Sequence, residues 1–199
     1  ITKLDVSKNI WLKKLYCANT GITSLDLSTN TNLNILNCSN TGITNLDVSK
    51  NTKLRELDCS STRITNLGLS QNTDLSYLNY SNTKIVGLLD VSKNTNLNRL
   101  NCSNTRITNL DISKNKLLDT LDCSSTKIVA LDVTQNTNLN RLNCSNTGIT
   151  NLDVSKNTKL RELDCSNTGI TKLDISKNKK LDSLTCTKTR IIFKKTHII

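Results

Sequence analysis

A 21-residue pattern repeats along almost the whole chain, and it constrains the fold more than any other feature. One copy begins at Leu33 and the next at Leu54, and each opens with Leu-x-x-Leu-x-Cys. A chain that repeats a unit of about 20–50 residues buries its apolar side chains between neighbouring copies, so its core grows in one dimension. We therefore predict an elongated array of stacked coils.

Aligning the copies at this period produces columns of identical residues. Two Leu columns, a Cys column, a Thr column, an Ile column and an Asn column recur in about nine copies. Leu36 and Cys38 are separated by one polar residue, as in a short strand that turns every second side chain inward. The returning half of each copy lacks the periodicity of an amphipathic helix, so we expect turns, short extended pieces or 3₁₀ turns there.

The pattern Leu-x-x-Leu-x-Cys-x-x-Thr-x-Ile is a leucine-rich-repeat signature with Cys as the third apolar residue. It predicts an α/β-type, strand-dominated repeat solenoid with short parallel strands on its concave face. We assign 1–191 to the solenoid, and 192–199 to a C-terminal cap remnant or the start of a further domain. One coil near 83–91 has 22 residues, and Tyr80 replaces Cys in the same copy. Because Ile1 enters in mid-copy, we expect a signal peptide or N-terminal cap ahead of it.

Composition narrows the classes of partner. The net charge of +11 and a pI near 9.4 admit an acidic partner. No stretch approaches the roughly 18 apolar residues of a membrane span, so we predict no membrane insertion. Aromatic residues make up only 3% of the chain, too few to interleave with the basic residues as single-stranded nucleic acid requires. We therefore expect no nucleic acid partner and a solvated basic edge beside the strands, made of Arg63, Lys84, Arg106, Lys127 and Arg190.

The cysteines stand in one column and could be a disulfide framework, a metal site or a buried ladder of thiols. In-register side chains of parallel strands point the same way, and Tyr80 divides the column into three and five, so complete pairing is impossible. Zinc is disfavoured because C-x-x-C is absent and the only His is His197. We predict a structural ladder of reduced, buried thiols at Cys17, Cys38, Cys59, Cys102, Cys123, Cys144, Cys165 and Cys186.

The remaining polar columns are interpreted as structural. The Asp column, which includes Asp47 and Asp90, could be a row of calcium ligands, but Asp also accepts hydrogen bonds from backbone N–H groups in turns. We favour turn residues supported by a Lys column three residues further on, and expect the Thr and Asn columns to satisfy backbone groups in the turns of each coil. We predict no metal and no cofactor. Without a His in the array there is no base for a nucleophile, and we predict no catalytic residues.

The outward strand positions are the candidates for contact with a partner. One of these columns varies strongly from coil to coil, and Tyr77 stands there among charged neighbours. Tyr and Arg are the residue types that most often carry interface energy. The predicted partner-binding residues on the concave face are Tyr16, Ile35, Arg55, Glu56, Asp58, Tyr77, Asn79, Arg99, Asn101, Arg141, Glu162 and Asp164.

Repeats of the form Leu-x-x-Leu-x-Cys-x-x-Thr-x-Ile-Thr-x-Leu-Asp-Val-Ser-x-Asn-Thr resemble bacterial internalin-type leucine-rich repeats, in particular their cysteine-ladder branch. The resemblance runs from Ile1 to about Ile191. The 21-residue period with Cys in the third apolar place is specific to that branch. The Thr column, where that family usually has Asn, Tyr80 and the 22-residue coil depart from it.

The resemblance implies a secreted or cell-surface bacterial protein whose concave face binds another protein or a surface glycan, often in adhesion to a host. We accordingly expect a non-catalytic binding module, most simply a monomer. Two other interpretations stay open at this stage. The array could be the substrate-recognition part of a larger secreted effector enzyme, or a structural spacer without a specific ligand.

Overall fold

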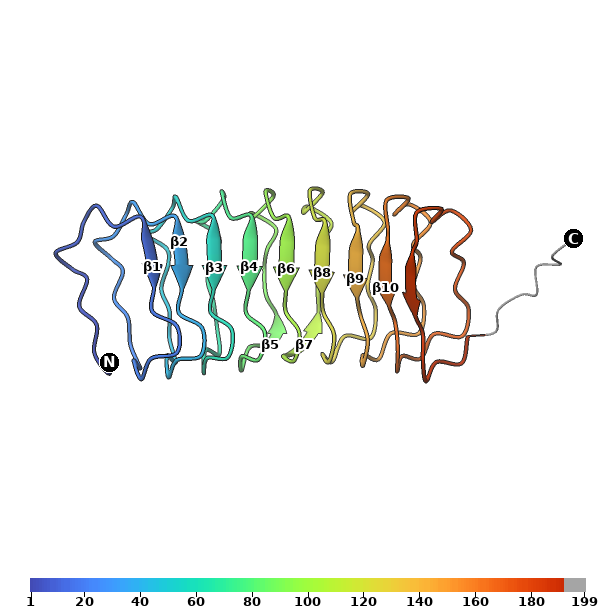
Figure 1. The fold of residues 1–199 in the computed structure, drawn as a ribbon, viewed down its shortest axis with the longest axis horizontal. Coiled ribbons are helices and arrows are strands. Elements are labelled where there is room, and N and C mark those ends of the chain that lie inside the picture. The colour runs from blue at the N-terminus through green and yellow to red at the C-terminus, as the bar shows by residue number, and fades with distance from the viewer. Residues whose placement is uncertain (192–199) are drawn as a thin grey trace, which may run out of the picture.

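The computed structural model describes residues 1–191, which form an elongated rod of stacked coils (Figure 1). The strands stand side by side along the rod, each running across its long axis. The strands are β1 (Lys14–Tyr16), β2 (Ile35–Asn37), β3 (Glu56–Asp58), β4 (Tyr77–Asn79), β5 (Val86–Leu88), β6 (Arg99–Asn101), β7 (Arg106–Asn109), β8 (Thr120–Asp122), β9 (Arg141–Asn143), β10 (Glu162–Asp164) and β11 (Ser183–Thr185).

Nine of these strands form one parallel sheet in the order β1-β2-β3-β4-β6-β8-β9-β10-β11. Equivalent residues of successive coils pair directly, as Leu36 does with Leu57. Residues 1–191 contain no helix, and turns and extended segments form the opposite side. The predicted strand-dominated solenoid of about nine coils is confirmed. The 3₁₀ turns that the prediction allowed are not present in these residues, and 192–199 lie outside the described part of the chain.

The apolar columns make one continuous core along the rod. In the second coil the inward residues Leu33, Leu36, Cys38 and Ile43 are all buried, and so are the equivalent positions of the following coils except the last, where they are only partly buried. The strand therefore turns its central Leu inward and its two neighbours outward, as the spacing predicted. Each coil alone could not bury these side chains, so the stacking of coils supplies most of the stability.

Each coil closes its turns with its own side chains. Thr41 donates its hydroxyl proton to the Cys38 carbonyl oxygen at 2.8 Å, and the Thr residues of the other coils do the same. The residue before each Thr adopts a positive φ, a conformation that Asn tolerates better than most residues. These residues are Asn19, Asn40, Ser61, Asn82, Asn104, Ser125, Asn146, Asn167 and Lys188.

The Asn column joins coils to each other. The Asn115 side-chain amide donates to the carbonyl oxygens of Val91 and Asn94 in the preceding coil, at 3.1 and 2.8 Å. The column therefore satisfies backbone groups of the turns, as expected, and these groups belong to the preceding coil, because the stacking of coils brings the earlier carbonyl groups within reach. The same pair of bonds, all 2.8–3.1 Å long, is made by Asn30, Asn51, Asn72, Asn94, Asn115, Asn136, Asn157 and Asn178.

The longer fourth coil differs from the others in two places. Its extra residue forms part of β5, which pairs with β7 in a second, two-stranded parallel sheet outside the nine-strand row (Figure 1). The pairing shifts register between Gly87 and Leu88, and Gly87 has a φ of 76°, which suits a residue without a side chain. Leu88 points outward, whereas Tyr80 fills the Cys position of this coil and is completely buried.

Candidate functional site

The concave face consists of the outward residues of the nine-strand sheet, arranged in two columns. The first residue of each strand belongs to one column and the third to the other, with the buried Leu between them. Because the strands are in register, Glu56, Tyr77 and Arg99 are direct neighbours on β3, β4 and β6. The fold therefore brings residues that are 21 or 22 positions apart in the sequence into one continuous row.

The third-residue column is held in place by local hydrogen bonds. Asp58 accepts both the N–H and the hydroxyl proton of Ser60 on one carboxylate oxygen, at 3.0 and 2.6 Å. Asn79 and Asn101 accept the same two bonds from the Ser residues that follow them. The other oxygen of Asp58 accepts a bond of 3.2 Å from the Asn79 amide. These half-buried side chains, and Asp164 with them, complete the end of each strand and keep little freedom to reorganise.

The first-residue column is freer, and Tyr77 is its largest side chain near the middle. Tyr77 is half-buried, and its direct neighbours in the column are Glu56 and Arg99. Burial raises the pKa of its hydroxyl, and the Asp58 carboxylate raises it further, while Arg99 acts in the opposite direction. The hydroxyl is therefore protonated at neutral pH and able to donate a hydrogen bond to a partner. Glu56 and Arg99, which flank it, form no ion pair with any residue in the range 1–191.

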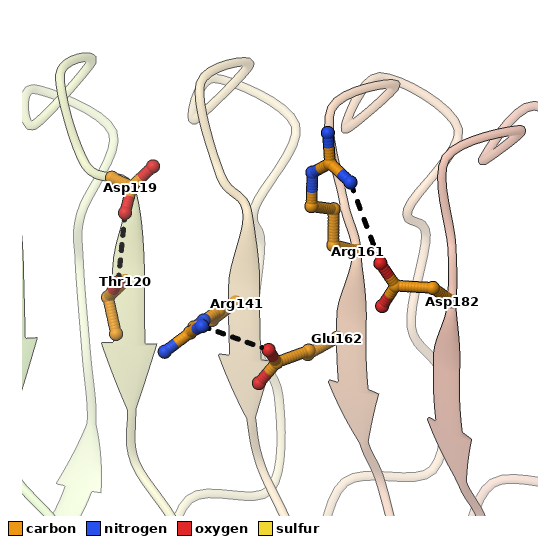
Figure 2. Close-up of polar contacts among 6 residues, drawn as sticks. All are labelled: Asp119, Thr120, Arg141, Arg161, Glu162 and Asp182. Atoms are coloured by element: carbon orange, nitrogen blue, oxygen red, sulfur yellow. Dashed lines mark hydrogen bonds and ion pairs between the residues drawn. The ribbon is translucent and has the colours of Figure 1, made fainter.

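The C-terminal half of the same face is different because its charges neutralise each other. Figure 2 shows Arg141 of β9 directed toward Glu162 of β10, with 3.1 Å between nitrogen and oxygen. Beside it, Arg161 lies 3.6 Å from Asp182. Both pairs are exposed, with side-chain accessibilities between 47% and 61%, so each contributes little to stability. Their effect is to neutralise the charges of Arg141, Glu162, Arg161 and Asp182 on this half of the face.

The predicted partner-binding residues thus divide into a cluster and outlying members. Ile35, Arg55, Glu56 and Tyr77 lie on or beside the adjacent strands β2, β3 and β4. Arg141, Glu162 and Asp164 lie beyond β8 on β9 and β10, and Tyr16 lies at the other end on β1, 65% exposed. Sequence reasoning missed the self-pairing of Arg161 with Asp182, although the 21-residue period places them on adjacent coils.

The cysteine ladder is present as predicted, since all eight cysteines are free thiols. Those within the array are buried, and Cys186 at the last coil is partly exposed. Burial raises the pKa of the Cys38, Cys102 and Cys144 thiols to about 12. At neutral pH these thiols are therefore protonated, and they behave as small apolar side chains of the core rather than as nucleophiles.

The Asp column also acts as predicted, but the lysines matter less than expected. The N–H of Ser49 donates to the Asp47 carboxylate at 2.8 Å. Hydrogen bonds from Ser49, first from its backbone and then from its side chain, lower the pKa of Asp47, and Lys50 adds a smaller contribution. Among residues 1–191 no group of three or more His, Cys, Asp or Glu side chains is placed to hold a metal ion. These residues also include no helix long and apolar enough to cross a membrane.

The stacked coils, the concave sheet and the internal thiol column define the class of fold as a leucine-rich-repeat solenoid. Among solved structures, the chain is similar to a functional domain of InlJ from Listeria monocytogenes that includes a cysteine ladder. The identity is 38%, the match covers 97% of this chain and 48% of that chain, and the TM-score is 0.83. The chain is an internalin-type leucine-rich-repeat solenoid with a cysteine ladder.

Two further neighbours share the fold at lower identity. An internalin, inlF, of Listeria monocytogenes is 22% identical, with 94% of this chain and 58% of that chain covered and a TM-score of 0.85. The leucine-rich-repeat ectodomain of the receptor kinase GASSHO1 of Arabidopsis thaliana, solved in complex with CASPARIAN STRIP INTEGRITY FACTOR 2, is 18% identical. The match covers 87% of this chain and 26% of that chain, and the TM-score is 0.75. The chain thus spans about half of the two internalins. No protein-family model and no curated protein matches it.

Proposed function

We propose that this solenoid is a non-catalytic binding module of a secreted or surface-attached bacterial protein, and that its concave face binds another protein. Adhesion to a host or another cell is the role that the internalin-type fold favours. The contact is centred on β3, β4 and β6 and extends outward along the neighbouring strands. The solved complex of GASSHO1 supports a protein or peptide ligand, since it shows this kind of solenoid with such a partner.

The observation that carries this proposal is the row Glu56, Tyr77 and Arg99. A half-buried Tyr lies between an acidic and a basic side chain, and neither charge has an ion-pair partner within residues 1–191. An aromatic anchor with unpaired charges of both signs beside it offers a partner apolar contact and two ion pairs. The paired residues of the C-terminal half offer a partner fewer free charges, because binding there would first have to disrupt the ion pair between Arg141 and Glu162.

The test compares two double variants of the chain. Tyr77→Ala with Arg99→Ala removes the proposed centre, and Arg141→Ala with Glu162→Ala removes a self-paired couple of the same face without changing net charge. Beads coated with each protein are measured for adhesion to cultured animal cells, and thermal unfolding checks that both variants fold. Two interface anchors contribute about 2 kcal/mol or more together, so we expect the first variant to bind at least about 30-fold more weakly.

The self-paired variant is expected to change binding less than about threefold. Equal adhesion by the first variant and the unchanged protein would overturn the assignment of the centre to Tyr77. A lack of adhesion by the unchanged protein itself would instead favour the spacer interpretation, because a spacer has no ligand to lose.

A further inference from the structure

Four consecutive coils carry a basic residue at a position where four other coils carry glycine. The residues are Arg63, Lys84, Arg106 and Lys127, hereafter the basic ladder, and all four are exposed. The glycines at the equivalent position, two before and two after the ladder, are Gly21, Gly42, Gly148 and Gly169. The unbroken run of charge therefore lies in the middle of the rod, and Arg190 of the last coil stands apart from it beyond two glycines.

The backbone fixes the spacing of the basic ladder. The N–H of Arg63 donates to the Ile43 carbonyl oxygen at 2.9 Å, and the N–H of Lys127 donates to that of Ile107 at 3.0 Å. Lys84 and Arg106 make the equivalent bonds to their preceding coils at 2.9 and 3.1 Å. Four positions joined in this way lie about 4.8 Å apart and span about 14 Å along the rod. The ladder is thus a straight row of cations on a rigid support.

Packing gives no reason for long side chains at this position. A Cβ added to Gly42 would lie 3.0 Å from the Thr23 methyl group, and one added to Gly148 would lie 3.0 Å from a Val129 methyl group. The position is therefore tight, and glycine fits it without adjustment. The occurrence of Arg or Lys in four adjacent coils is better explained by what their charged ends meet outside the fold.

The charges of the basic ladder have no partners within the described chain. None of the four side chains makes an ion pair or a hydrogen bond with any residue in the range 1–191. The Asp column follows the ladder along each coil, but Gly68 replaces its member in the coil of Arg63. Parallel, in-register like charges repel each other. A row of them without counter-charges binds anions readily, and an anion with several charges binds most strongly.

The residues around the basic ladder are small, hydroxylic or apolar. The next outward column contains Thr65, Val86, Thr108 and Val129, and Val86 and Val129 are 57% and 63% exposed. Arg106 opens β7, which pairs with β5 beside it, so this part of the surface is a small parallel sheet (Figure 1). A polar hollow lined by Gly42 and Ser61 adjoins Arg63 at one end of the ladder. The surface combines a row of cations with a shallow apolar and hydroxylic strip.

We propose that the basic ladder binds a linear anionic polysaccharide, laid along the rod with its sulfate or carboxylate groups in step with the rungs. One sugar unit is about as long as one coil is thick, so the charged groups on one side of the chain recur at whole numbers of rungs, and the strip of Val and Thr contacts the sugar rings. An extended acidic peptide fits less well, since its same-face side chains repeat every 6.6–6.8 Å or so. Single-stranded nucleic acid fits less well too, because the strip offers no aromatic side chain for its bases.

This site is separate from the proposed centre at Tyr77. In each coil the ladder residue follows the concave strand by several positions and lies beyond the turn that contains the positive-φ residue. The two proposals therefore fail independently, since variants of one surface leave the other unchanged.

The test uses the whole chain and a matched control of equal charge change. The ladder variant carries Arg63→Gln, Lys84→Gln, Arg106→Gln and Lys127→Gln. The control carries Lys50→Gln, Lys93→Gln, Lys114→Gln and Lys156→Gln, in a column where two coils already have Gln71 and Gln135. Calorimetry measures binding of a heparin-derived octasaccharide and an oligogalacturonate of equal length, and thermal unfolding confirms that both variants are folded.

We expect the ladder variant to lose at least about tenfold in affinity at 0.15 M salt, with a shallower dependence of affinity on salt, because fewer counterions are released. The control should lose less than about threefold. Tighter binding of heparin than of oligogalacturonate would show a preference for the more highly charged, sulfated chain, and the reverse would show that carboxylates alone are preferred. Equal losses in both variants would overturn the proposal, as would tighter ladder-dependent binding of an eight-residue oligothymidine or an octaglutamate peptide.

Discussion

At the scale of single residues, polar side chains of this protein mostly complete the backbone of their own turn. Asp47 accepts the N–H of Ser49, and Asp58 accepts that of Ser60. The spacing of acceptor and donor by two residues is visible in the sequence and would have predicted both contacts. The same spacing distinguishes residues with a structural role from residues such as Tyr77. The ring and hydroxyl of Tyr77 have no counterpart at the same position of the other coils.

Gly68 occupies the Asp position of its coil without a side chain, and this absence leads to a prediction about stability. It lies in the Asp column, so Ser70 lacks the carboxylate partner that the corresponding residue has in other coils. A Cβ at Gly68 meets nothing within 4 Å, and its φ is not positive. We expect Gly68→Asp to raise the free energy of unfolding by about 1 kcal/mol, measured by urea denaturation. Gly68→Ala separates the effects, because it supplies only the backbone contribution, and an equal gain from both variants would exclude the hydrogen bond.

At the scale of the coil, the Asn column is the polar connection between neighbours. Its side chains satisfy two carbonyl oxygens of the preceding coil while remaining completely buried in most coils. The accepting oxygens of these Asn side chains have no hydrogen-bond partner within residues 1–191. The column thus directs its donors toward one neighbour only, which gives the stack a polarity from one end to the other.

Removing one amide from the middle should therefore destabilise the stack. We expect Asn115→Ala to lower the free energy of unfolding by about 2–3 kcal/mol, since it removes two buried hydrogen bonds between coils, although the carbonyl groups of Val91 and Asn94 keep the backbone donors of Asn94 and Leu97. Asn9→Ala is the matched control, because Asn9 is exposed and donates to no earlier coil among the described residues. Urea denaturation of both variants gives the comparison. A loss at Asn115 no larger than that at Asn9 would contradict the proposed connection.

At the scale of the whole molecule, the cysteine ladder links stability to pH. Burial raises the pKa of Cys38, Cys102 and Cys144 to about 12, whereas an unfolded thiol ionises near pH 8.5. The folded state therefore holds its thiol protons more tightly. The stability contributed in this way is complete below about pH 8.5 and is lost progressively as the pH rises toward 12.

We expect the free energy of unfolding to fall by about 1 kcal/mol for each fully buried thiol between pH 7.5 and pH 9.5. Urea denaturation under reducing conditions measures it. The variant Cys102→Ala with Cys144→Ala should be less stable at pH 7.5 but lose less on going to pH 9.5, because two of the titrating groups are gone. A slope unchanged by the two substitutions would show that other groups cause the loss.

The sequence contained most of the architecture because its repeating columns report which side chains face inward. The sequence did not show how far one coil is shifted relative to the next. This shift places the Asn115 amide within reach of the Val91 carbonyl group, and it places Arg161 beside Asp182. The second sheet was also unpredicted, because the extra residue of the fourth coil shows where a bulge is needed but not that Gly87 and Leu88 pair with β7. For the site, the row around Tyr77 was predictable, whereas the pairing that neutralises Arg141 depends on side-chain direction.

The hydrogen bonds between coils also determine how the rod should respond to mechanical force. Its inter-coil hydrogen bonds, such as those of Asn115, run from one coil to the next along the rod. A pull applied at the two ends therefore loads the coil interfaces in series, so the weakest interface yields first and the coils detach one at a time. Each coil that peels away releases about 21 residues, which lengthens the chain by roughly 60 Å. A molecule anchored at one end and bound at the other would yield by stepwise extension and absorb tension before its contact broke.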